Sequence, residues 1–161
     1  MKDDSVFRPY QEIFDKICEH YALNLYGAHG IEHWENVYAN TMMLSKVYGI
    51  ESNIFMLFAL LHDSKRLDED DDFEHGIRAA SFALELINNG KITLEAEDAK
   101  RLIYACANHT KANKTDPLYQ DIIVQICLDA DKLDIGRVGV IPEKSHFLTP
   151  YAQTLVAKGN R

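Results

Sequence analysis

Apolar residues recur at steps of three and four along most of the chain, which is the spacing of one face of a helix. The first run predicts a helix over residues 10–25 and comprises Ile13, Phe14, Ile17, Cys18, Tyr21 and Leu25. Gly27 and Gly30 then interrupt the pattern. A second helix is expected over residues 31–48, and Gly49 ends it.

The third predicted helix, residues 53–63, is apolar on nearly every side until it reaches His62. A helix that is hydrophobic all round belongs in the centre of a bundle, and Ser52 or Asn53 is its expected cap. Further helices are expected over residues 74–88, 93–108 and 116–133, whereas the charged stretch 64–73 is expected to be an exposed loop.

No strand pattern is present, so the sequence predicts an all-α helical bundle of about six main helices. It is expected to form one domain over residues 1–161. The core of that domain covers about residues 27–136, and an irregular C-terminal segment, 137–161, has room for a short terminal helix.

Composition narrows the class of protein. The chain has 161 residues, of which 47% are hydrophobic, as expected for a globular domain. Asp and Glu number 25 against 17 Lys and Arg, and the net charge of −8 argues against a nucleic-acid polymer as partner. The longest apolar run, Ile54 to Leu61, is too short for a membrane helix. The acidic N-terminus does not resemble a signal peptide.

We therefore expect a cytoplasmic protein without a membrane partner. Three cysteines without a CxxC pair suit a reducing compartment, and each lies in an apolar helical context typical of a small buried side chain. Whether the chain forms a homo-oligomer is left open.

The pair His62 and Asp63 ends the most apolar helix of the chain. Burying unpaired ionisable groups costs several kcal/mol, roughly, unless something compensates them. A divalent cation would compensate both, since it takes imidazole nitrogen and carboxylate oxygen as ligands. The alternative is a helix that simply emerges into water, where a histidine suits the C-terminal dipole.

Other helix ends carry further candidates, and a bundle can collect such residues around one interior point. They are His33 in HGIEHWENV, His75 in EHGIRAA, His109 in ACANHTK and Asp131 in LDADKLD. Each also has an ordinary explanation. His109 could interact with a helix dipole, His75 could lie at the surface, and Asp131 could be an ordinary acid beside Lys132.

Taken in chain order, these motifs resemble the HD-domain superfamily of metal-dependent phosphohydrolases. GIEHWENV is similar to the family's first-histidine helix, ALLHDSKR to its His-Asp motif and ADKLD to its terminal aspartate. EHGIRAA and NHTK further resemble the branch with two extra histidines and a two-metal centre. The resemblance covers about residues 27–136.

The resemblance implies one or two divalent transition-metal ions, for which Mn, Fe, Co, Ni or Zn suit mixed nitrogen and oxygen ligands. The implied ligands are His33, His62, Asp63, His75, His109 and Asp131. Asp63 would bridge the ions, with His33, His62 and Asp131 on one and His75 and His109 on the other. A metal-activated water would be the nucleophile.

Two positions near these motifs leave the ligand set open. Asp129 and Asp131 point in different directions on a helix, and ADKLD favours Asp131, so Asp129 is expected to be solvated or to support a ligand. Gly30 argues against a common helical face for His29 and His33, so His29 is expected at the rim. His20 and His146 lack a motif and are expected at the surface.

Basic residues close to these motifs are the candidates for phosphate binding. Lys65 and Arg66 follow the His-Asp pair and are predicted to act with Asp63 in catalysis and to bind substrate. The other substrate-binding candidates are Arg78, Lys111 and Arg137. For each of them a solvated position is the ordinary alternative.

The expected function is hydrolysis of a phosphate ester or anhydride in a small, nucleotide-like substrate. The alternative is a non-catalytic metal-binding sensor or an inactive homologue, because the same ligands would hold the metals in both cases. A histidine phosphotransfer bundle needs one exposed histidine on a helix face and fits the several helix-end histidines poorly.

Overall fold

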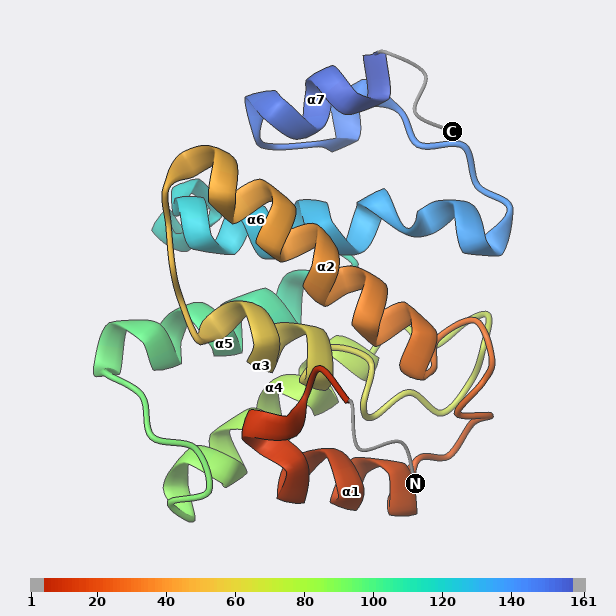
Figure 1. The fold of residues 1–161 in the computed structure, drawn as a ribbon, viewed down its shortest axis with the longest axis vertical. Helices are drawn as coiled ribbons and strands as arrows, with labels where there is room; N and C mark the ends of the chain where they lie inside the picture. The colour runs from red at the N-terminus through yellow and green to blue at the C-terminus, as the bar shows by residue number, and fades with distance from the viewer. Residues whose placement is uncertain (1–4, 158–161) are drawn as a thin grey trace.

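A computed structural model describes residues 5–157, and within this range the chain contains helices and loops without a β-strand (Figure 1). The all-α prediction is therefore confirmed. The α-helices are α1 (Gln11–His20), α2 (Ile31–Tyr48), α3 (Ile54–Leu61), α4 (His75–Asn88), α5 (Ala96–Asn108), α6 (Ile122–Leu133) and α7 (Pro150–Ala157).

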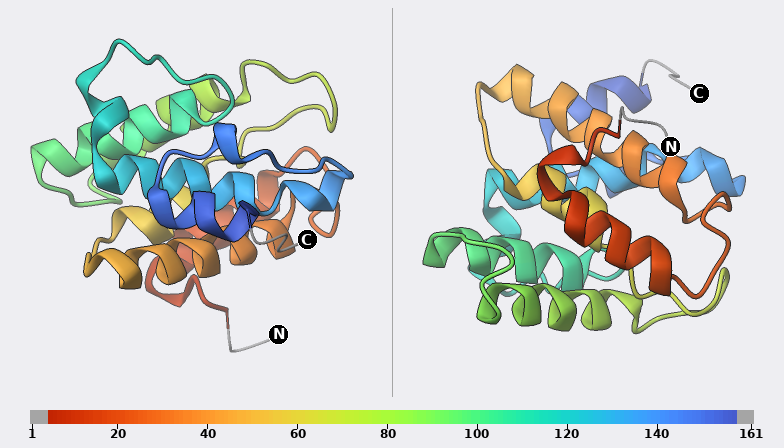
Figure 2. Two further views of the ribbon diagram at one scale, coloured as in Figure 1. Left: turned by 90° about the horizontal axis from the view of Figure 1, so that it is seen from above. Right: turned by 60° about the horizontal axis from the view of Figure 1, so that its bottom comes forward.

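Helix α3 forms the centre of the bundle, as its all-round apolar sequence predicts. It packs against α2, α4, α5 and α6, and every one of its side chains except that of Met56 is buried. Helices α4 and α5 run side by side on one flank, and α2 packs along α6 on the other (Figures 1 and 2). The C-terminal end of α3, where His62 and Asp63 follow, is thereby enclosed by neighbouring helices.

The first helix is shorter than its apolar spacing predicts. α1 ends at His20, and the following residues form turns up to Gly30. The backbone N–H of Ile31 donates to the carbonyl oxygen of Leu25. Gly30 passes so close to this carbonyl that a Cβ would lie 2.0 Å from the oxygen. Only glycine fits this turn, which sets the start of α2.

Two later helices begin after their predicted starts. α5 begins at Ala96, and residues 117–120 form a separate 3₁₀ helix ahead of α6. The carboxylate of Asp121 accepts hydrogen bonds from the backbone N–H groups of Ile123 and Val124. This cap fixes the start of α6 at Ile122.

The C-terminal segment contains two 3₁₀ turns and then the short helix α7. Asp129 anchors it, because its carboxylate accepts hydrogen bonds from the backbone N–H groups of Leu148 (2.9 Å) and Thr149 (2.7 Å). The expectation that Asp129 is solvated is wrong, since its side chain is buried. Burial raises the pKa of Asp129, and the two backbone donors oppose that shift.

Cys106 and Cys127 are buried and Cys18 is partly buried, in keeping with the prediction that the cysteines act as small apolar side chains. Across the helices that the structure describes, none combines the length and the apolar character needed to cross a membrane.

Candidate metal centre

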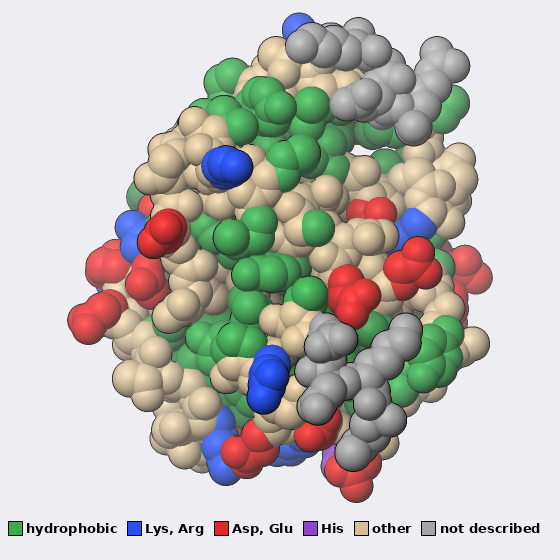
Figure 3. All heavy atoms as spheres, in the orientation of Figure 1, with side chains coloured by type: hydrophobic (Ala, Val, Ile, Leu, Met, Phe, Trp, Pro, Cys, Tyr) green, Lys and Arg blue, Asp and Glu red, His purple; other side chains and the backbone are tan. Residues whose placement is uncertain are grey.

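The candidate ligands converge at one point inside the bundle, although they come from five helix ends. His33 lies in the first turn of α2, His62 and Asp63 follow α3, and His75 begins α4. His109 follows α5 directly, and Asp131 lies in the last turn of α6. The four histidines and Asp63 are buried, and the face of the molecule in Figure 3 shows almost no histidine surface.

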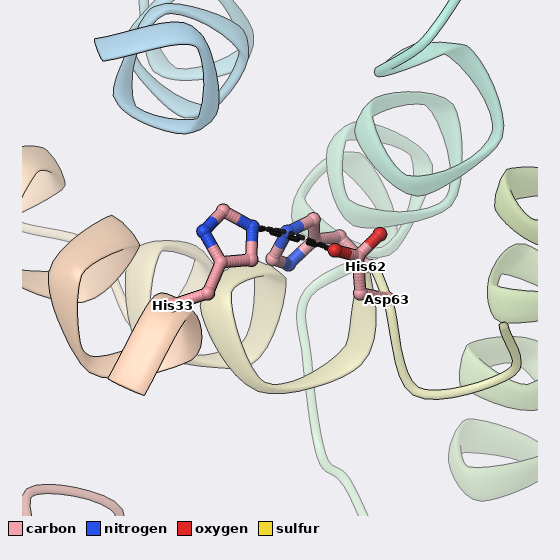
Figure 4. Close-up of side chains that lie close together, drawn as sticks. All are labelled: His33, His62 and Asp63. Carbon is pink, nitrogen blue, oxygen red and sulfur yellow. Dashed lines mark hydrogen bonds and ion pairs between the residues drawn. The ribbon is translucent and has the colours of Figure 1, made fainter. Parts of the chain in front are cut away.

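One half of this cluster surrounds the Nε2 atoms of His33 and His62, which lie 3.0 Å apart (Figure 4). The Oδ2 atom of Asp63 lies 3.3 Å from Nε2 of His33 and 3.5 Å from Nε2 of His62. The Oδ1 atom of Asp131 lies 3.2 Å and 3.4 Å from the same two nitrogens. Four donor atoms therefore face one point, which we call the His33 half.

The other half uses the second oxygen of the same carboxylate. The Oδ1 atom of Asp63 lies 3.1 Å from Nε2 of His75 and 3.4 Å from Nε2 of His109. These two nitrogens are 2.8 Å apart. We call this group of three donor atoms the His75 half. Asp63 thus belongs to both halves, with one oxygen in each.

The spacing of these atoms suits metal ligands. Donor atoms that surround an ion at about 2.0–2.2 Å lie about 3.0–3.5 Å from one another in tetrahedral or octahedral arrangements. Two groups of side chains could each hold an ion. The first comprises His33, His62 and Asp63, and the second comprises Asp63, His75 and His109.

Hydrogen bonds on the far side of each imidazole determine which nitrogen faces inward. Each Nδ1 atom contacts an oxygen that can only accept a proton in a hydrogen bond. The acceptors are the Asp134 carboxylate for His33 (2.7 Å), the carbonyls of Phe58 and Ala59 for His62 (3.1 and 3.0 Å), that of Asp72 for His75 and that of Cys106 for His109 (2.7 Å). Nδ1 of His33, His62 and His109 therefore carries a proton, and their Nε2 atoms face the cluster. At His75 the Asp72 carbonyl favours the same arrangement, although the donor Nη1 of Arg66 also lies 3.1 Å from Nδ1.

Lone pairs on four nitrogens and charged carboxylate oxygens repel one another unless a positive charge lies between them. Burial alone would raise the pKa of Asp63, but the neighbouring imidazoles of His62, His109 and His33 hold it well below its usual range. Burial likewise opposes the charge on Asp131, whereas hydrogen bonds with His33 and His62 lower its pKa. Both carboxylates stay ionised.

The same excess of negative charge acts on His33. Burial would lower its pKa, but hydrogen bonds with Asp131, Asp134 and Asp63 raise it to about 10. The cluster therefore attracts positive charge, either as a proton on His33 or as a metal cation that takes its place. The donor set fits one or two divalent cations.

Gly76 allows the His75 half to form. A Cβ at this position would lie 2.7 Å from the carbonyl oxygen of Cys106 and 3.2 Å from that of Ala107. Because glycine lacks this atom, the start of α4 approaches the end of α5 closely enough for His75 and His109 to meet.

The structure separates the two basic residues that follow the His-Asp pair. Arg66 is buried beside the His75 half, with its Nη1 atom 3.1 Å from Nδ1 and 3.3 Å from Nε2 of His75. Lys65 is directed elsewhere, since its Nζ atom lies 4.2 Å from the ring centroid of Phe82 on α4. The prediction that Lys65 contributes to the centre finds no support in this arrangement.

Two of the other substrate-binding candidates are engaged in holding loops. Arg78 donates to the carboxylate of Asp72 and, at 3.1 Å, to the carbonyl oxygen of Lys65. Arg137 donates to the carbonyl oxygens of Ala28 (2.7 Å) and Asp134 (2.9 Å). These contacts show that both arginines hold loops in place, and their predicted contacts with substrate stay a prediction.

Lys111 lies in the loop after α5, beside the His75 half. It lines a pocket of about 430 Å³ together with Arg66 and His75. Of the five basic candidates, the structure brings Arg66 and Lys111 next to the cluster.

Sequence reasoning missed Asp134, which orients His33 from 101 residues further along the chain. It is the last residue of the ADKLD motif, one helical turn after Asp131, and this spacing was the available signal. His29 stays outside the converging atoms. It is buried, and its Nδ1 atom lies 2.6 Å from the carboxylate of Glu69. His20 and His146 are exposed, as expected.

Comparison with known proteins supports the fold. No family model matches the chain, and a comparison with curated proteins finds no match. The chain is similar to the crystal structure of a predicted HD superfamily hydrolase from an uncultured Thermotogales bacterium. The TM-score is 0.67 at 23% sequence identity, over 92% of this chain and 83% of that chain. This likeness shows that the two chains share a fold, as the resemblance described in the sequence analysis implies.

Proposed function

We propose that this protein is a metal-dependent phosphohydrolase that cleaves a phosphate ester or anhydride in a small, nucleotide-like molecule. The observation that carries the proposal is the convergence of four imidazole Nε2 atoms on both oxygens of Asp63. The likeness in fold to a predicted hydrolase supports it.

The arrangement of the cluster in two halves supports a division of the proposed ligands between two cations. His33, His62, Asp131 and one oxygen of Asp63 would hold one cation, and His75, His109 and the other oxygen of Asp63 a second. Manganese, iron, cobalt, nickel and zinc suit this mixture of nitrogen and oxygen. Such cations, when bound, lower the pKa of water and neutralise phosphoryl charge, which is the chemistry that phosphate-ester hydrolysis requires.

The side chains around the cluster prepare it for this chemistry. Asp134 and the backbone carbonyls hold each imidazole in one orientation, so that little reorganisation is needed on binding. Arg66 places a buried guanidinium beside His75, where it can donate hydrogen bonds to a phosphoryl oxygen. With a net charge of −8, the molecule as a whole repels anions. Arg66 and Lys111 offset this repulsion locally.

The decisive experiment combines metal analysis with a hydrolysis panel. Full-length protein loaded with manganese is expected to hold one or two ions per chain and to release phosphate from a nucleotide. Asp63→Asn is expected to lose both properties, because it removes the charge shared by the two halves. Asp15→Asn, an equivalent change at an exposed position on α1, should retain them.

Two other outcomes of this experiment would count against the proposed hydrolase. Folded protein that stays metal-free after loading with manganese or iron would overturn the proposal. Bound metal without phosphate release from any ester would instead indicate a metal-binding sensor or an inactive homologue.

A further inference from the structure

A pocket of about 430 Å³ opens beside the His75 half of the metal centre, between the loop that joins α3 to α4 and the loop after α5. It is lined by Arg66, Asp70, Asp72, Phe73, His75, Thr110 and Lys111. This volume lies within the range of roughly 300–1,000 Å³ typical of small-molecule sites. A substrate held at the centre has this space next to it.

Arg66 lines the pocket as a buried cation with unused donors. Its side chain is only 8% exposed, and its Nε atom has no hydrogen-bond partner among residues 5–157. Its bond to the carbonyl oxygen of Glu69 is long, at 3.4 Å. Buried donors in proteins are normally paired. The guanidinium is therefore suited to an oxygen-rich ligand at the inner end of the pocket.

Phe73 offers an aromatic surface at the outer end. Its side chain is 82% exposed and stays outside the hydrophobic core. The backbone beside it is nevertheless held in place. The Asp72 carboxylate accepts hydrogen bonds from Arg78 and from the backbone N–H of Leu67, and the Asp72 carbonyl accepts one from His75. An exposed ring that lines a pocket and is carried by a backbone held in this way is suited to stacking against a flat ligand.

The charge of the same loop limits which ligand fits. Asp68, Asp70 and Asp71 form no ion pair with any residue in the range 5–157, whereas Arg78 neutralises Asp72. Besides Arg66, Lys111 is the other cation in the pocket lining, and it balances one of these three carboxylates. The remaining negative charge of the loop repels further phosphate groups on this side of the centre. The Phe73 ring and the acidic loop together favour a group that is flat and uncharged.

From these features we infer that the pocket binds the nucleoside of a nucleoside monophosphate, with its base stacked on Phe73 and the phosphate toward Arg66. This inference rests on the proposed function. In the reaction, the oxygen of water bonds to phosphorus and the ester P–O bond breaks. The leaving oxygen takes up a proton derived from water, which gives nucleoside and inorganic phosphate. Phe73 would determine specificity, and the acidic loop would exclude leaving groups that carry additional phosphates.

The inference is tested by binding, independently of turnover. Calorimetric titration of the manganese-loaded full-length chain with adenosine should show binding, whereas ribose, which lacks a base, should not bind. Phe73→Ala is expected to weaken adenosine binding about tenfold, the size of one lost base–aromatic stack. Phe73→Tyr should restore it, because the ring is kept.

Leu67→Ala provides the matched control. Leu67 lies on the same loop and is 63% exposed, but it does not line the pocket. This variant should bind adenosine as the unaltered chain does. Where hydrolysis is measured, Phe73→Ala should raise KM for a nucleoside monophosphate and leave that for ribose 5-phosphate unchanged.

Adenosine that fails to bind, or that binds Phe73→Ala and the unaltered chain equally well, would overturn the inference, even if phosphate esters are cleaved. Adenosine binding that depends on Phe73 in a protein without phosphatase activity would support the pocket and count against the proposed function alone.

Discussion

The two halves of the candidate metal centre differ in their donors and in their surroundings. The His33 half has four donor atoms, two of them from carboxylates, and a third carboxylate, Asp134, supports His33. The His75 half has three donor atoms, and its histidines are held by backbone carbonyls. The guanidinium of Arg66 also lies 3.3 Å from Nε2 of His75.

This difference indicates that the two halves have different roles, one in holding a cation tightly and the other in leaving room for a substrate. The His33 half has two ligand carboxylates against one in the His75 half, which should make it the tighter cation site. Arg66 lies beside a ligand of the His75 half, whereas Arg137 reaches only the supporting carboxylate of Asp134, at 4.0 Å. The His75 half, with fewer protein donors and a pocket beside it, leaves more room for a substrate. Each of the following changes tests whether the halves behave differently in this way.

Removing one ligand from each half should have the largest effect. His33→Ala is expected to reduce activity more than about 100-fold, beyond the roughly 10–100-fold typical of supporting residues, and to leave at most one weakly held ion. His75→Ala should also lose activity but keep one tightly bound ion. Elemental analysis after gel filtration measures the ions retained. Equal losses in the two variants would contradict this difference in roles.

The pH dependence of stability should reveal the charge of the His33 half. In the metal-free fold the pKa of His33 is raised from 6.5 to about 10. Its protonation therefore stabilises the fold fully below about pH 6.5, and this contribution is lost as the pH rises through about 10.

Chelator-treated protein should accordingly lose up to a few kcal/mol, roughly, of unfolding free energy across this window. Metal-loaded protein should not show this loss, since the cation takes the place of the proton. Denaturant titrations at several pH values measure the difference. An equal change of unfolding free energy with pH in the two forms would refute the expectation.

Gly76→Ala should affect the His75 half selectively. The new methyl group would collide with the Cys106 carbonyl, which accepts the hydrogen bond from His109. Crowding of this kind costs about 1–3 kcal/mol. Thermal unfolding should show this loss, together with weaker binding of the second ion. Gly136→Ala is the control, because nothing lies within 4 Å of its added Cβ.

Asp134→Asn should affect the His33 half alone and to a smaller extent. The change keeps the shape of the side chain but removes the charge that orients His33. We expect metal affinity to fall about 10–100-fold at this half, whereas the affinity of the His75 half for its ion should not change. Competition with a chelator of known affinity measures it, and Glu143→Gln, at an exposed position, is the control.

The elements of the fold could be predicted from apolar spacing because packing on one face determines a helix. Helix starts were less predictable. The α6 start depends on the Asp121 cap, and the turn before α2 depends on the close approach of Gly30 to Leu25. Both are contacts between particular atoms, which periodicity does not encode.

Prediction of the site from the sequence meets the same limit, because it too depends on contacts between particular atoms. The motifs, taken in their order along the chain, predicted the six residues that converge, since each motif carries its own local pattern. It could not tell that Arg66 points toward His75 while Lys65 points toward Phe82, because side-chain direction after a helix end depends on the turn. The role of Asp134 likewise required contact between α2 and the end of α6.

Anomalous diffraction from crystals of the manganese-loaded protein tests the central claim most directly. Two peaks are expected on either side of Asp63, one among His33, His62 and Asp131 and one beside His75 and His109, with the first peak stronger at limiting metal. An ordered cluster without anomalous signal after loading, or peaks only on the acidic loop at residues 68–72, would contradict the metal centre.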